Sequence, residues 1–247
     1  MSPRLPFILG IALWAAYAVL WIGGVGGHVL YGGTPANTAW AAPAFLLLAG
    51  LIVLTSSHSG WRALCAAGAI GFVSELIGVH FGVPFGRYQY TRALQPMFWH
   101  VPVVLLFAWM VLIAFVREMR VPVLIGAAWM TAIDSVIDPV ASQPLAYWRW
   151  IEGGHYYGIP ALNFIGWYLV SALILAVLPA RGPRRMPASL AGITIILFFA
   201  ILALAHRLYI PGAIGLALTA ISCRLLWSAI LEERRGISSS NPPAYPR

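Results

Sequence analysis

The chain has 247 residues, of which 61% are hydrophobic and only 9% are charged. This composition excludes an ordinary soluble domain and indicates a polytopic helical membrane protein, because apolar runs recur from one end to the other. All 15 basic residues are arginine and the formal net charge is +8, but the arginines are scattered, mostly singly, between apolar segments. That placement indicates membrane topology rather than a nucleic-acid surface.

Eight apolar segments have about the length that spans a bilayer. In chain order they cover residues 5–23, 38–55, 61–83, 97–116, 121–138, 159–179, 188–206 and 211–231. The first is interpreted as a retained helix, because no clear small-residue cleavage site follows it. We expect an all-α bundle forming one membrane domain over 1–231, with a catalytic core at 70–170 and a disordered cytoplasmic tail over 232–247. The alternative is a layout of seven helices, in which the segments on either side of the short hairpin near Pro211 are merged into one.

The arginines also predict the orientation of the helices. An eight-helix layout places ten of the 15 arginines on one side and four on the other, which favours cytoplasmic termini and the cell inner membrane. The larger set is Arg4, Arg62, Arg117, Arg120, Arg181, Arg184, Arg185, Arg234, Arg235 and Arg247, and the smaller is Arg87, Arg92, Arg149 and Arg207. The outer side then carries two loops rich in polar and aromatic residues, 84–96 and 143–160.

Four acidic side chains lie within or against the predicted membrane segments: Glu75, Asp134, Asp138 and Glu152. A carboxyl group at such depth is costly, and it usually faces a cavity and marks a functional site. Glu75 lies past the midpoint of the third helix, and the two aspartates lie in the last turns of the fifth, so these three are expected to meet in the outer half of the bundle. Glu152 falls in the second loop, where it pairs with Arg149 or is solvated.

Asp134 and Asp138 are spaced i, i+4, so on a helix they lie one turn apart on the same face. Pro139 disfavours helical geometry at the residue before it, so the helix is expected to end at Asp138. Two carboxyl groups at this spacing in a poorly hydrated site resist ionising together, which leaves a protonated acid available. The structural alternative is that Asp138 caps a turn or pairs with Arg149.

Polar and aromatic residues are predicted to surround these acids. Asn163, one turn into the sixth helix, is expected to orient water or a carboxylate, or to tie two helices together. The residues expected to contact substrate are Arg87, Tyr88, Tyr90, Trp148, Tyr156 and Tyr157. Such rings either form an interfacial belt or stabilise a cation through their faces. His80, His100 and His155 lack paired ligand spacing, so no metal and no cofactor are expected.

A weak internal repeat relates the two polar loops. Pro102 and Trp109 are seven positions apart after the first loop, and Pro160 and Trp167 are seven apart after the second. The pattern fits a duplicated helix–loop–helix unit in which each copy brings acid to a shared cavity.

Several motifs are specific when taken together. They are Glu75-x-x-Gly78 followed by GVPFGRYQY, Val101-Pro102 with Trp109, DSVIDPVA at 134–141, Tyr147-Trp148, and YYGIPALNFIGW at 156–167. These motifs, which cover roughly residues 70–170, resemble the carotenoid 1,2-hydratases of the CruF type. That family includes γ-carotene 1′,2′-hydratases and bisanhydrobacterioruberin hydratases, and its reaction needs no redox cofactor. The first loop departs from the family at TRALQPMFWHVP, where an acidic or glycine-containing version is expected.

The resemblance implies addition of water across the terminal C1,C2 double bond of lycopene, γ-carotene or a C50 relative that enters from the bilayer. This chemistry needs a proton donor, a stabilised tertiary cation and a positioned water. We assign Asp134 as the donor to C2, Asp138 or Glu75 as the base, and Asn163 as a water-orienting group. The expected partners are the carotenoid itself, with other carotenoid pathway enzymes as further candidates, and no nucleic acid.

Three other functions fit parts of this pattern. A UbiA-type prenyltransferase would hold Mg²⁺ and a diphosphate with Asp-x-x-x-Asp, but it needs two aspartate-rich segments and this chain has one. A carotenoid end-group cyclase would use the same protonation and capture the cation internally. A proton-coupled transporter would use the acids as a relay, although they lie toward one face rather than at the midplane.

Overall fold

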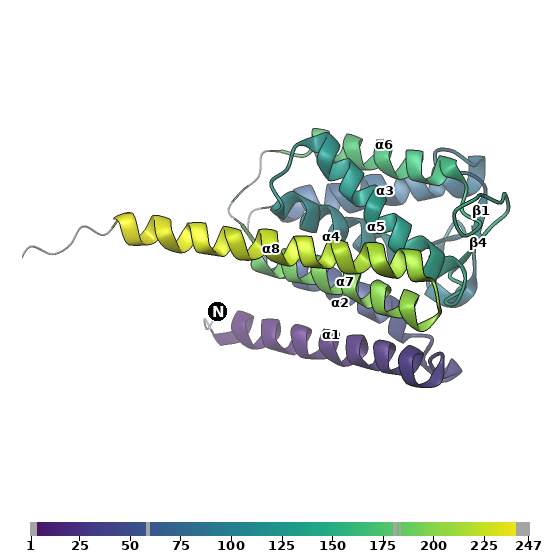
Figure 1. Cartoon of the computed structure of the whole chain (residues 1–247), viewed down its shortest axis with the longest axis horizontal. Coiled ribbons are helices and arrows are strands. Elements are labelled where there is room, and N and C mark those ends of the chain that lie inside the picture. Colours follow the sequence, from purple (N-terminus) through teal and green to yellow (C-terminus); the bar gives the residue numbers. More distant parts are fainter. Residues whose placement is uncertain (1–3, 58–59, 180–181, 183, 241–247) are drawn as a thin grey trace, which may run out of the picture.

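The computed structural model describes residues 4–57, 60–179, 182 and 184–240. It contains eight α-helices within that range: α1 (Arg4–Tyr31), α2 (Ala41–Thr55), α3 (Trp61–Phe81), α4 (Leu105–Glu118), α5 (Val123–Ser142), α6 (Ala161–Val177), α7 (Met186–Ala205) and α8 (Tyr209–Ser240). Consecutive helices run in opposite directions, so α1 begins and α8 ends at the same end of the bundle (Figure 1). Six of the described helices are long and apolar enough to cross a membrane, and α6 is a shorter apolar helix. The predicted all-α membrane bundle of eight helices is confirmed.

The fourth helix begins later than predicted. Instead of starting at Met97, the chain forms a hairpin in which β2 (Met97–Phe98) pairs with β3 (Val101–Pro102). The two turn residues, Trp99 and His100, have positive φ angles of 43° and 65°, as the twist of a two-residue hairpin turn requires. Hydropathy alone does not distinguish this apolar hairpin from a helical turn.

The fifth helix continues beyond its predicted end. α5 runs through Pro139 to Ser142, so the prediction that it ends at Asp138 is wrong. Proline has no N–H and leaves the carbonyl four residues earlier, that of Ser135, without its helical donor. The hydroxyl of Tyr156 donates to that carbonyl at 2.8 Å. A donor from the second loop thus replaces the missing backbone hydrogen bond.

Two terminal helices are also longer than predicted. α1 continues past residue 23 to Tyr31 through a glycine-rich stretch, because an apolar environment favours internally bonded backbone even at helix-breaking residues. α8 continues past residue 231 to Ser240, since backbone hydrogen bonding outlasts the apolar pattern that defined the predicted end. The rest of the predicted tail, 241–247, lies outside the described residues.

A short antiparallel ribbon closes one end of the bundle. β1 (Tyr88–Tyr90) from the first polar loop pairs with β4 (Trp148–Trp150) from the second. The paired positions are Tyr88 with Trp150, Gln89 with Arg149, and Tyr90 with Trp148. Because side chains alternate along a strand, the four aromatic rings share one face of this aromatic ribbon. Gln89 and Arg149, on the other face, are exposed.

The ribbon joins two similar units, α3–β1–α4 and α5–β4–α6. Within each unit the two helices pack against each other, and α7 packs against α1, α2, α4, α5 and α8. The two tryptophans related by the predicted repeat, Trp109 and Trp167, stack with ring centroids 4.3 Å apart and an interplanar angle of 14°. α1 lies at the edge of the bundle (Figure 1). The acids of both units therefore face the same interior space beneath the ribbon.

Candidate active site

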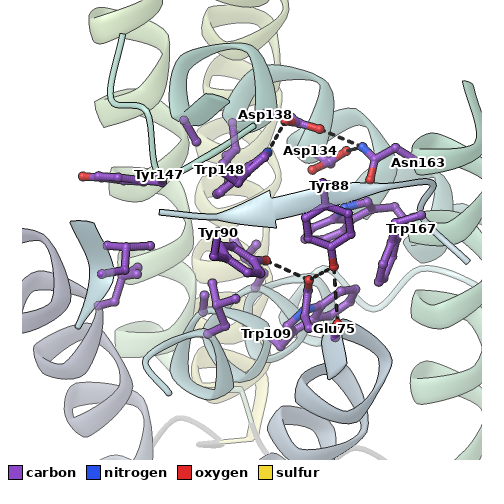
Figure 2. Close-up of a pocket in the computed structure, with 18 of the residues that line it drawn as sticks. Glu75, Tyr88, Tyr90, Trp109, Asp134, Asp138, Tyr147, Trp148, Asn163 and Trp167 are labelled. Carbon is purple, nitrogen blue, oxygen red and sulfur yellow. Dashed lines mark hydrogen bonds between the residues drawn. The ribbon is translucent and has the colours of Figure 1, made fainter. Parts of the chain in front are cut away.

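A cavity of about 90 Å³ lies beneath the aromatic ribbon (Figure 2). Its polar lining consists of Glu75, Asp134, Asp138 and Asn163. Its aromatic lining consists of Phe85, Tyr88, Tyr90, Trp109, Tyr147, Trp148, Trp150, Trp167 and Phe199. Its aliphatic lining consists of Leu46, Leu94, Leu105, Ala108, Leu112, Ile137, Ala141 and Ile195. The cavity therefore combines a few convergent polar groups with extensive apolar walls, as small-molecule sites commonly do.

Glu75 is held by three donors from its own unit. The side chain is 6% exposed, and its Oε2 accepts from the hydroxyls of Tyr88 at 2.6 Å and Tyr90 at 2.8 Å. Its Oε1 accepts from the indole Nε1 of Trp109 at 3.0 Å. An indole N–H can only donate, so this set of partners matches a carboxylate that acts as an acceptor at both oxygens.

The two tyrosines remain donors over a wide pH range. Burial raises the pKa of Tyr88 and Tyr90 well above the ordinary value of 10.0, and the neighbouring Glu75 charge raises it further. Desolvation disfavours the charged form of a phenol, and an adjacent negative charge acts in the same direction. Both hydroxyls are therefore neutral near pH 7 and able to donate to Glu75.

Asp138 is held by the other strand of the ribbon. Its Oδ1 accepts from Nε1 of Trp148 at 2.8 Å and of Trp150 at 3.0 Å. Its Oδ2 accepts from Nδ2 of Asn163 at 2.9 Å. The alternation of β4 thus directs two indole N–H groups at one carboxyl oxygen, just as the alternation of β1 directs two hydroxyls at Glu75. Figure 2 shows Trp148 directed at Asp138, and Tyr88 and Tyr90 directed at Glu75.

Asn163 links the two aspartates. Its Nδ2 donates to Oδ2 of Asp134 at 2.7 Å as well as to Asp138. An amide nitrogen carries two hydrogens, so one Asn163 side chain supplies each aspartate with a single bond. Asp134 and Asp138 are 2% and 1% exposed, and the pair is therefore shielded from bulk water.

Aromatic rings enclose the space between the acids. Tyr88 and Trp150 have ring centroids 5.1 Å apart, and Tyr90 and Trp148 lie edge to face at 5.8 Å. Ring faces attract cations through their quadrupole. Together with the buried carboxyl groups, these rings can stabilise positive charge that develops on an apolar molecule in the cavity.

The structure brings together seven of the predicted site residues. Glu75, Asp134, Asp138, Asn163, Tyr88, Tyr90 and Trp148 all line the cavity. Arg87, Tyr156 and Tyr157, which were predicted to contact substrate, are outside that lining. Arg87 precedes the inward-facing Tyr88 and is exposed, as strand alternation requires. Tyr156 bonds to the Ser135 carbonyl, Tyr157 packs edge to face on it at 4.9 Å, and Glu152 is exposed in the loop.

Several lining residues were not predicted. Trp109, Trp150 and Trp167 lie in the cavity wall, and two signals in the sequence point to them. Tyr-Gln-Tyr and Trp-Arg-Trp have the period of a strand, and the repeat pairs Trp109 with Trp167. The walls contributed by α2 and α7, outside the predicted core, have no comparable signal because their apolar residues resemble any membrane helix. No group of three or more His, Cys, Asp or Glu side chains within the described residues is arranged to hold a metal ion.

Comparisons with known proteins agree with the motifs. A family model described as carotenoid biosynthesis protein matches residues 38–222, a range that contains every residue lining the cavity. The bisanhydrobacterioruberin hydratase of Haloarcula japonica is 30% identical over 136 residues, covering 50% of this chain and 45% of that relative. The matched region thus spans less than half of the relative's length. No solved structure matches the chain. The family indicated by the sequence motifs is confirmed.

Proposed function

The chain belongs to the carotenoid biosynthesis protein family, and we propose that it adds water across the terminal C1,C2 double bond of an acyclic carotenoid end group. One observation carries the proposal: three buried carboxyl groups and facing aromatic rings share a cavity with apolar walls. The relative named as a hydratase supports the reaction type. Lycopene, γ-carotene or a C50 relative provides such an end group.

Asp134 is assigned as the proton donor. Two aspartates that share one amide group in a dry site do not both carry charge at low cost. Asp138 accepts three hydrogen bonds, two of them from indoles that can only donate, whereas Asp134 accepts one from Asn163 among the described contacts. The proton is therefore more stable on Asp134, from which it is transferred to C2 of the alkene.

Protonation at C2 leaves a tertiary cation at C1. The carboxylates of Glu75 and Asp138 supply negative charge, and the ring faces of the aromatic ribbon add quadrupole attraction. Both carboxylates are fixed by hydrogen bonds before the reaction begins, so little reorganisation is required as the charge develops. This preorganisation lowers the barrier to forming the cation.

Water captures the cation. The water oxygen forms a bond to C1 and its proton passes to the carboxylate of Asp138, which acts as the base. Asp134 and Asp138 share the Asn163 amide, so the proton has a short return path to Asp134. The cycle consumes one water and one alkene, forms one tertiary alcohol, and needs no oxidant or reductant.

The position of the arginines supports an orientation in the membrane. Arg62, Arg117, Arg120 and Arg185 lie at the end of the bundle opposite the ribbon, and Arg184 directly precedes Arg185 there. The side chains of Arg4, Arg181, Arg234, Arg235 and Arg247 lie outside the described residues. With this end toward the cytoplasm, both termini are cytoplasmic in the inner membrane. The carotenoid then enters sideways from the bilayer, and other carotenoid pathway enzymes are candidate partners.

The test is expression in bacteria that accumulate lycopene or γ-carotene. The expected product is heavier by one water, and membranes that already contain unlabelled pigment, when incubated in deuterated water, should place one deuterium at C2. Asp134→Asn should lower conversion by about a hundredfold or more, whereas Glu152→Gln, at an exposed acid, should convert normally. An unchanged pigment profile with both substrates would argue against hydration, and a product bearing a β-ring would identify a cyclase.

A further inference from the structure

We infer that the end of the bundle opposite the ribbon binds a phosphate group, supplied by an anionic lipid headgroup or by a free phosphate anion. A second cavity, of about 340 Å³, lies there between the start of α3, the end of α4 and the segment leading into α7. Its charged lining residues are Arg62, Arg117, Glu118, Arg120 and Arg185. We call this cavity the arginine pocket. The arginine pocket is independent of the proposed reaction, because none of the residues that line it also lines the acid-lined cavity.

The charges of the arginine pocket are unbalanced. Four guanidinium groups line it, and Glu118 is the single acidic residue among its lining residues. The carboxylate of Glu118 is already engaged, since its Oε2 accepts from the backbone N–H of Arg185 at 2.9 Å. That bond lies at the start of α7, where the helix dipole favours negative charge. A recess with this excess of positive charge attracts a further anion.

Three of the guanidinium groups are positioned by other contacts. Arg117 donates from Nη2 to the carbonyl of Pro179 at 2.9 Å. Arg120 donates from Nη2 to the carbonyl of Gly182 at 2.7 Å, and Arg185 donates from Nη1 to the hydroxyl of Ser57. A guanidinium has five N–H donors in a planar fork, and each of these bonds uses one. Arginine forks held in place match the geometry of phosphate oxygens. The pocket is thus organised before an anion binds.

Arg120 has a backbone conformation that is uncommon for arginine. Arg120 follows α4 with φ of 58°, in the left-handed region where helices commonly end with glycine. Arg120 lines the pocket from this position, where a glycine would contribute no side chain.

The location indicates phosphate chemistry at the membrane surface. The pocket lies where α3 begins and α4 ends. The ends of membrane helices reach the headgroup zone, and basic recesses between membrane helices bind anionic headgroups. Arg62 lies at the pocket with its guanidinium carbon 5.4 Å from the ring centroid of Trp61. A tryptophan beside an arginine is typical of the interfacial zone.

The experiment uses the full chain in nanodiscs of three kinds: phosphatidylcholine alone, phosphatidylcholine with phosphatidylglycerol, and phosphatidylcholine with inorganic phosphate in the buffer. The readouts are the midpoint of thermal unfolding and the phospholipid retained in native mass spectrometry. The pocket variant is Arg62→Gln with Arg120→Gln. The matched control is Arg92→Gln with Arg207→Gln, which removes the same charge from exposed positions at the ribbon end.

Phosphatidylglycerol should raise the midpoint of the wild type and of the control, and its apparent affinity should fall about tenfold or more in the pocket variant. Dependence on phosphatidylglycerol alone would identify the headgroup as the source, and an equal arginine-dependent shift with inorganic phosphate would identify the free anion. The variant Arg62→Lys with Arg120→Lys keeps the charge and should retain a response, which separates lost binding from lost folding. Equal responses in the pocket variant and the control, or no response to either phosphate source, would overturn the inference.

Discussion

The hydroxyl of Tyr156 donates to the carbonyl of Ser135 over 2.8 Å, at the turn of α5 where Pro139 leaves the backbone without a donor. This turn lies between Asp134 and Asp138. The second polar loop therefore contributes to the site in two ways: its strand holds Asp138 directly, and Tyr156 completes the helical turn on which both aspartates are mounted.

Removing the hydroxyl of Tyr156 should disturb the site, although Tyr156 does not line the cavity. Tyr156→Phe leaves the Ser135 carbonyl without its donor, which should lower the free energy of unfolding by about 1–3 kcal/mol. Carotenoid conversion should fall as the spacing of the aspartates loosens. Thermal unfolding in detergent and pigment analysis measure the two effects. Tyr157→Phe is the control, and equal effects in both variants would contradict this role of Tyr156.

The indole donors to Asp138 should be required for activity. Trp148→Phe with Trp150→Phe removes two charge-assisted hydrogen bonds from a buried carboxylate, so stability should fall by about 3 kcal/mol or more. Conversion should fall about tenfold or more, because the proton is no longer confined to Asp134. Trp40→Phe with Trp227→Phe, at exposed positions, controls for loss of tryptophan. Normal turnover in the first variant would refute the assignment of Asp138 as a preorganised carboxylate.

The tyrosines that hold Glu75 predict a pH dependence. Their pKa is raised above 10.0 in the folded chain, so the unfolded chain ionises first as the pH increases. The free energy of unfolding should therefore fall above about pH 10, by up to about 1.4 kcal/mol per pH unit for each tyrosine. Tyr88→Phe with Tyr90→Phe should flatten this slope.

Unfolding in detergent between about pH 8 and 11 measures the slope, together with tyrosinate absorbance. Tyr31→Phe with Tyr209→Phe, at residues that are 84% and 65% exposed, should leave the slope as in the wild type. Identical slopes in the two double variants would show that Tyr88 and Tyr90 are not the groups responsible.

A glycine sets the position of Trp109. A Cβ at Gly71 would overlap the indole of Trp109, which donates to Glu75. Gly71→Ala should therefore destabilise the protein by about 1–3 kcal/mol and reduce conversion, although alanine is the better helix former. Gly10→Ala, where nothing lies within 4 Å of the added carbon, should be neutral or stabilising. A stabilised, fully active Gly71→Ala protein would contradict this packing argument.

Several features were predictable because their cause is local. The lengths of the apolar runs identify a bundle of membrane helices, and the cost of a carboxyl group in lipid singles out Glu75, Asp134 and Asp138. Two predicted helix boundaries, the start at residue 97 and the end at residue 138, were wrong because neither local rule includes the feature that sets the boundary. Hydropathy does not report the hairpin turn at Trp99, and a proline rule does not include a donor that comes from a distant loop.

Local patterns along the chain are sufficient to identify a helical membrane protein whose acids gather at one end, since burial costs and helical spacing act on each segment separately. The groups that hold those acids depend on tertiary contacts. The pairing of Tyr88–Tyr90 with Trp148–Trp150 joins segments far apart in the chain, and strand alternation then turns Tyr88 inward and Arg87 outward. The stacking of Trp109 on Trp167 likewise depends on how two helix pairs dock. Register and docking are properties of the packed chain, and no local pattern specifies them.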